Sequence, residues 1–108
     1  MRQVTSTPDT PGLIVRVNAL LSEMLPEFLM TCRTDLLTIR SAMVTADYRT
    51  VEDLGHRMRG AGDGLGFDFV TEIGGEIENA AMRHDGPVIR GKVKIMQNFL
   101  DHVEVVVA

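Results

Sequence analysis

Apolar residues recur at alternating steps of three and four along most of this 108-residue chain, and this spacing limits the fold more than any other feature. An α-helix has 3.6 residues per turn, so residues at such steps form one stripe along its surface. Four long segments, joined by short links, carry a stripe and predict an all-α, antiparallel, up-down-up-down four-helix bundle. The stripes are Leu29, Cys32, Leu36, Ile39 and Met43; Val51, Leu54, Met58, Ala61 and Leu65; Val70, Ile73, Ile77 and Ala80 or Ala81; and Ile89, Val93, Met96, Leu100, Val103 and Val107.

Local signals predict where these helices begin and end. Proline fits the first turn of a helix but not its interior, so a helix is expected to start at Pro26 and to run to about Ala46. Asp47 is expected to cap the next helix, which ends in a cluster of glycines. Asp68 is expected to cap the helix after it, and Pro87 fits the first position of the last one.

Two further expectations concern the helix that starts near Asp68. Gly74 and Gly75 are small enough to let a neighbouring helix come near, and Glu78 is expected to face outward.

The two ends of the chain have different compositions. Residues 1–12 contain threonine, serine, aspartate and two prolines, and we expect a flexible leader there. Residues 13–108 have the length of a single domain. A short extra helix is predicted near the start of this domain, and no strand-like run is longer than the tail at residues 103–107. The extra helix has the apolar positions Leu13, Ile14, Val17, Leu20, Leu21 and Met24.

Composition excludes several classes of protein. The formal net charge of −4 disfavours non-specific nucleic-acid binding, which needs a basic surface. No run approaches the roughly 18 apolar residues of a membrane span, and the N-terminus lacks the apolar stretch of a signal peptide. The single cysteine, Cys32, excludes an intramolecular disulfide and lies in an apolar stripe, so it is expected to be a core residue. These observations favour a cytoplasmic protein.

The segment from Leu54 to Phe67 has the most unusual composition, because five glycines fall within twelve residues. Each interior helical glycine costs about 1 kcal/mol relative to alanine. Gly64 and Gly66 can end the helix. Gly60 has no such explanation if the helix reaches Leu65, and we expect that its missing side chain permits close approach by a partner.

His56 lies off the apolar stripe of the same helix. Arg59 and Gly60 follow it at three and four residues, so the three positions form one patch on the helix surface. The sequence therefore predicts an exposed imidazole with a cation on one side and no side chain on the other.

Phosphoryl transfer suits this patch better than other chemistries. The three histidines do not have metal-ligand spacing, and the chain has neither a nucleophile elbow nor the phosphate loop of ATP-binding proteins. Neutral imidazole is a nucleophile at physiological pH and can attack a phospho-aspartate to form phosphohistidine. Arg59 can neutralise part of the charge that spreads over the phosphoryl oxygens.

The run His56-Arg57-Met58-Arg59-Gly60, followed by Gly66-Phe67, resembles the histidine-containing phosphotransfer (HPt) domain family. The family pattern is a histidine, a lysine or arginine three residues later, a glycine next, and a second glycine followed by an aromatic residue. Lysine is commoner than arginine at the position of Arg59, but arginine keeps the charge. The helical layout resembles the family from about Leu25 to Val107.

This resemblance implies a phosphorelay intermediate without an ATP site or kinase activity. It would carry a phosphoryl group between receiver-domain aspartates, on response regulators and on a hybrid histidine kinase of a two-component system. By resemblance, His56 accepts the group on Nε2, Arg59 is the phosphate-side cation, and Gly60 is the steric gap for the partner. No cofactor is expected on this chain, because the magnesium belongs to the receiver domain. A monomer is expected.

Two other functions stay open at this point. The chain can be a helical interaction module that binds a signalling partner and never carries phosphate. It can also be a small enzyme with His56 as general base, which needs a concave pocket with a second polar group. Neither alternative explains Gly60 as well as docking of a receiver does.

Overall fold

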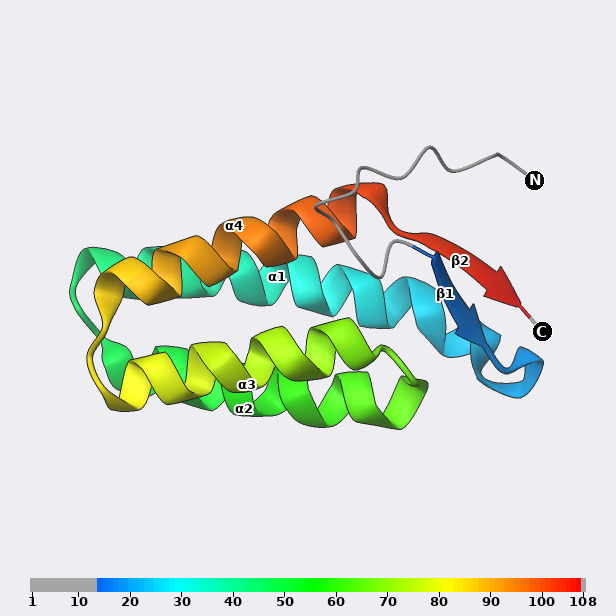
Figure 1. Cartoon of the computed structure of the whole chain (residues 1–108), viewed down its shortest axis with the longest axis horizontal. Coiled ribbons are helices and arrows are strands. Elements are labelled where there is room, and N and C mark those ends of the chain that lie inside the picture. Colours follow the sequence, from blue (N-terminus) through cyan, green and yellow to red (C-terminus); the bar gives the residue numbers. More distant parts are fainter. Residues whose placement is uncertain (1–13, 108) are drawn as a thin grey trace.

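The computed structural model describes residues 14–107, so the predicted leader and Leu13 lie outside the described residues. Within this range the chain forms four α-helices: α1 (Leu25–Val44), α2 (Tyr48–Leu65), α3 (Asp68–Met82) and α4 (Gly86–His102). Consecutive helices run in opposite directions (Figure 1). The predicted antiparallel four-helix bundle is confirmed, and α1 differs from its predicted range by only one or two residues at each end.

The short extra helix predicted at the start of the domain is correct only in its second half, where it is a 3-10 helix, and its first half is a strand. Residues Ile14–Val17 form strand β1, and a 3-10 helix, η1, follows at Ala19–Met24. β1 pairs in parallel with β2 (Glu104–Val107), so the strand before the four helices lies beside the strand after them (Figure 1). Alternate residues of β1, Val15 and Val17, are buried, and this two-residue period is that of a strand.

The predicted seam of the last helix is correct only as far as Leu100. The helix α4 ends at His102, and Val103 is already extended. Val107, the last position of the predicted seam, belongs to β2. β-Branched residues pack well on a strand, and β1 supplies the hydrogen-bonding partner that the local sequence pattern does not reveal.

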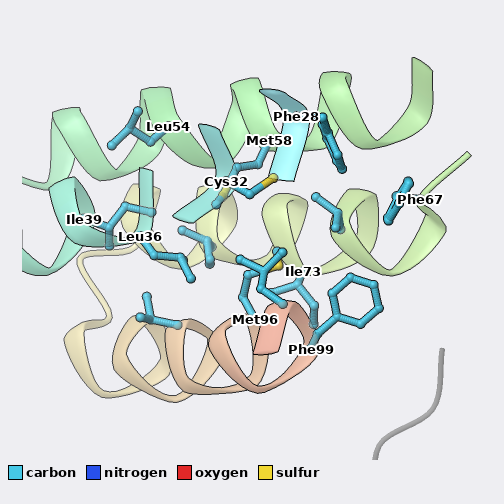
Figure 2. Packing of buried hydrophobic residues seen from close by; sticks show 14 of the residues in the cluster. Phe28, Cys32, Leu36, Ile39, Leu54, Met58, Phe67, Ile73, Met96 and Phe99 are labelled. Carbon is cyan, nitrogen blue, oxygen red and sulfur yellow. The ribbon is translucent and has the colours of Figure 1, made fainter. Parts of the chain in front are cut away.

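The core lies between the four helices and is filled by aliphatic side chains and three phenylalanines (Figure 2). The ring centroids of Phe28 and Phe67 are 4.9 Å apart, and those of Phe67 and Phe99 are 6.4 Å apart with perpendicular rings. Cys32 is buried among these residues as predicted, and burial raises the pKa of its thiol to about 12, with the Asp35 carboxylate adding to the shift.

Within α1 and α2, three predicted stripe positions are not fully buried. Ala61 is exposed, and the adjacent Gly62 is buried in its place. Leu29 and Met43 of α1 are only partly buried, since Phe28 and Ala42 face the core more directly. The stripe predictions therefore identify the correct face of each helix but misplace residues at its edge.

Side chains and backbone conformations set the helix ends. The Asp47 side chain accepts a hydrogen bond from the Thr50 backbone N at 3.2 Å, which confirms the predicted cap. Gly66 ends α2 in the left-handed conformation, with φ of 79°. Asp68 is the first residue of α3 rather than its cap, which is Phe67. Pro87 is the second residue of α4, after Gly86.

Glycines bring α2 and α3 into backbone contact. A Cβ atom on Gly55 would lie 2.7 Å from the Glu78 backbone N and 2.8 Å from the Gly74 carbonyl oxygen. A Cβ atom on Gly74 would lie 2.8 Å from the Arg59 backbone N. The predicted close approach at Gly74 is confirmed, whereas the nearest atom at Gly75 belongs to the flexible Arg59 side chain. This contact holds α3 against the part of α2 that carries His56.

Candidate functional site

The three predicted site residues share one surface of α2. His56, Arg59 and Gly60 are all exposed, and the His56 side chain is 65% accessible to solvent. The helix places them together because they are three and four residues apart, while Val51, Leu54 and Met58 turn toward the core.

Glu78 of α3 completes this surface. The sequence pattern placed Glu78 on the outer face of its helix, but the residue is buried, and its side chain is only 11% exposed. One carboxylate oxygen, Oε2, lies 3.0 Å from Nδ1 of His56. Glu78 lies one turn after Gly74, so the backbone contact between α2 and α3 directs it to the imidazole.

The neighbours of His56 determine which ring nitrogen carries the proton. Nδ1 lies 3.0 Å from Glu78 Oε2 and 3.2 Å from Nη2 of Arg59. A carboxylate can only accept and a guanidinium can only donate, so Nδ1 cannot bond to both. We assign an Nδ1–H that donates to Glu78, because a charge-assisted bond to a buried carboxylate is the stronger one. In this tautomer, Nε2 keeps a lone pair for reaction.

Arg59 instead pairs with Glu78. Its Nη1 lies 3.4 Å from Oε1 of Glu78, the carboxylate oxygen that does not face the histidine. This oxygen is buried and accepts no hydrogen bond. The guanidinium therefore balances a buried negative charge while about half of the Arg59 side chain remains exposed beside the imidazole.

Three glycines of α2 follow His56, and they differ in their surroundings. A Cβ atom added to Gly60 or Gly64 would have no neighbour within 4 Å, whereas one on Gly62 would lie 2.7 Å from the Thr71 hydroxyl and 2.9 Å from its backbone N. Gly60 and Gly64 are thus open to the solvent, and Gly62 serves packing against α3. An apolar groove of about 380 Å³ lies next to Gly64, between α2, α1 and η1, with Phe28 and Leu65 in its lining.

The other two histidines have different surroundings. The ring of His84 stacks on Tyr48 with a centroid distance of 4.5 Å, and Nδ1 of His102 lies 2.8 Å from the Asn98 carbonyl oxygen. Among residues 14–107, His56 is the histidine that pairs with a carboxylate. The same residues contain no cluster of three or more histidine, cysteine, aspartate or glutamate side chains that could hold a metal ion. None of the described helices combines the length and apolar character needed to cross a membrane.

Comparison with known proteins identifies the family of the four-helix bundle. No curated protein and no solved structure matches the chain. The model of the Hpt domain family matches residues 23–105, which include all four helices and both members of the His56–Glu78 pair. The chain therefore belongs to the Hpt domain family, the phosphocarriers that transfer phosphoryl groups through histidine in phosphorelay signalling.

Proposed function

We propose that His56 accepts a phosphoryl group from the aspartate of one receiver domain and passes it to the aspartate of another. The observation that carries this proposal is the exposed imidazole whose Nδ1 faces the buried Glu78 carboxylate at 3.0 Å. In the neutral imidazole, this pairing keeps the proton on Nδ1 and the lone pair on Nε2, and an exposed lone pair is what attack on an external phosphorus atom requires.

The transfer forms one bond and breaks one. The Nε2 lone pair attacks the phosphorus of the aspartyl phosphate, the P–O bond to the aspartate breaks, and the carboxylate leaves with that electron pair. Positive charge develops on the imidazole as the N–P bond forms. The Nδ1–H stays with the ring, and its hydrogen bond to Glu78 stabilises that charge. The return transfer to a second receiver reverses these steps.

Arg59 and Gly60 have separate proposed roles. Arg59 supplies a positive charge one helical turn from the imidazole, where it attracts the phosphoryl oxygens. Gly60 leaves space for the loops of the receiver, which is consistent with the empty surroundings of its Cβ position. The apolar groove beside Gly64, one helical turn after Gly60, offers further contact area.

The partners follow from family membership and from the chemistry of the site. We propose receiver domains of response regulators and of a hybrid histidine kinase as partners, with magnesium bound by the receiver and no cofactor on this chain. We also propose that the chain is a cytoplasmic monomer without kinase activity of its own. Residues 13–108 are proposed to form one domain.

Transfer from receiver domains tests the proposal. Receivers charged with acetyl phosphate are mixed with the full chain, and the product is examined for acid-labile, base-stable phosphate. We expect label on the parent protein and none on His56→Ala, which should keep its helical circular dichroism because the ring lies outside the core. If several charged receivers bind to the folded chain and none transfers label, the chain is an interaction module instead.

A further inference from the structure

A second groove lies between α1 and α4. These two helices form one side of the bundle, and α2 and α3 form the other (Figure 1). His56 belongs to α2 and Glu78 to α3. We call it the α1–α4 groove. Its floor consists of Ile39 and Met43 of α1 and of Ile89 and Val93 of α4. Its volume is about 240 Å³, which is enough for one or two aliphatic side chains but below the usual size of a pocket for a small-molecule ligand.

Three cations line the α1–α4 groove, although the chain as a whole is acidic. They are Arg40, Arg90 and Lys94, and none forms an ion pair with a described residue. Arg40 donates a hydrogen bond to the neutral Gln97 side chain at 3.2 Å. By contrast, five of the other cations in residues 14–107 are paired with carboxylates: Arg33, Arg49, Arg57, Arg59 and Lys92.

Exposed apolar side chains extend this surface along α1. Leu37 precedes Arg40 by three residues and Val44 follows it by four, so both lie next to Arg40 on the helix surface. They are 64% and 85% exposed. The two residues lie about 10 Å apart along the helix axis, a span that an elongated chain segment can cover.

We propose that the α1–α4 groove binds an acidic segment of a partner protein. Aliphatic side chains of that segment enter the groove between Ile39 and Val93, and its carboxylates pair with Arg40, Arg90 and Lys94. An apolar floor beside cations that have no carboxylate partner in residues 14–107 is complementary to such a segment. Because this groove and the His56 site lie on different helix pairs, the segment and a receiver domain can bind together. This proposal does not depend on phosphoryl transfer.

A model peptide tests the proposal on the full chain. The probe is an acetylated, amidated and fluorescently labelled peptide of about 12 residues, with two leucines one helical turn apart and glutamates on both sides. We expect saturable binding by fluorescence anisotropy that weakens as sodium chloride is added, since salt screens charge pairing. Methyl resonances of Ile39, Met43, Ile89 and Val93 should shift on binding. His56→Ala should bind the peptide as the parent does.

Two charge-reversed variants make the test specific. Arg90→Glu/Lys94→Glu should weaken binding at least ~10-fold, because like charges then face the peptide. Arg16→Glu/Arg83→Glu changes the net charge equally, at exposed cations that do not line the α1–α4 groove, and should bind within about 2-fold of the parent, since these side chains are screened by solvent and salt.

Several results would overturn the proposal. The first is the absence of saturable binding up to ~1 mM peptide, which corresponds to a very weak complex. The second is an equal loss of peptide affinity in both charge-reversed variants. The third is a set of chemical-shift changes confined to a surface other than the α1–α4 groove. Binding of octanoate at the groove without binding of the peptide would assign it to small apolar anions instead. A dimer whose interface covers the groove would assign it to a second copy of this chain.

Discussion

Gly60 and Gly55 lie five residues apart on α2, and alanine at the two positions should have opposite effects on stability. A Cβ atom on Gly60 meets nothing within 4 Å, so Gly60→Ala keeps the benefit of helix propensity, about 1 kcal/mol. It also reduces the conformational freedom of the unfolded chain. For a domain of this size, such a gain should raise the melting temperature by about 4–8 °C.

Gly55→Ala should destabilise the protein despite the same gain in propensity. The added Cβ would lie 2.7 and 2.8 Å from backbone atoms of Glu78 and Gly74, which cannot rotate away as a side chain can. The two helices must therefore separate, and overpacking of this kind costs about 1–3 kcal/mol or more. Because Glu78 then moves away from His56, transfer should also slow.

Thermal melts and a transfer assay on Gly60→Ala, Gly60→Leu and Gly55→Ala test this reasoning together. Gly60→Leu should fold normally but transfer poorly, because displacing a docked receiver by about 1 Å can cost ~100-fold in rate. A melting temperature of Gly60→Ala below that of the parent, with unimpaired transfer, would refute the docking role of Gly60. A Gly55→Ala protein as stable as the parent would show that the α2–α3 contact is looser than described.

Three further predictions concern the site and the core. Glu78→Gln should slow transfer only in part, because its amide oxygen still accepts from Nδ1–H but carries no charge to stabilise the ring, while Glu78→Ala should slow transfer by roughly 10-fold or more and shift the His56 tautomer seen by NMR. Arg59→Lys should keep most transfer, and Arg59→Glu should slow it strongly. If Arg59→Glu transfers as fast as the parent, the Arg59 side chain does not contact the phosphoryl group. Cys32, with its thiol pKa raised to about 12, should stay protonated and resist iodoacetamide at pH 8 until the protein is unfolded; rapid labelling of the folded chain would contradict its burial.

Most of the bundle could be predicted from helical periodicity because each helix buries one continuous face. The pattern fails where burial depends on a distant partner. Val15 and Val17 are buried because β1 pairs with β2, some ninety residues later in the chain. A local window that includes Leu20 and Met24 instead fits a helix, although both of these side chains are exposed.

The site shows the same division between local and long-range information. His56, Arg59 and Gly60 are close in sequence, and helical geometry alone places them together. Glu78 is 22 residues from His56, and a lone glutamate on an amphipathic helix is normally solvated. Its inward position depends on the contact of Gly55 with Gly74. These two glycines are therefore the sequence feature from which the position of Glu78 could have been predicted. The sequence pattern assigned close approach to Gly74 but did not connect it with the residue one turn later.

The identity of the phosphorylated nitrogen tests the central claim most directly. Long-range nitrogen–proton NMR correlations of the histidine rings, recorded before and after incubation with a charged receiver, distinguish all three histidines and both ring nitrogens. Before transfer, we predict a proton on Nδ1 of His56 and a lone pair on Nε2. After transfer, Nε2 of His56 should carry the phosphoryl group, and His84 and His102 should be unchanged. Phosphate on His84 or His102, or on Nδ1 of His56, would contradict the account.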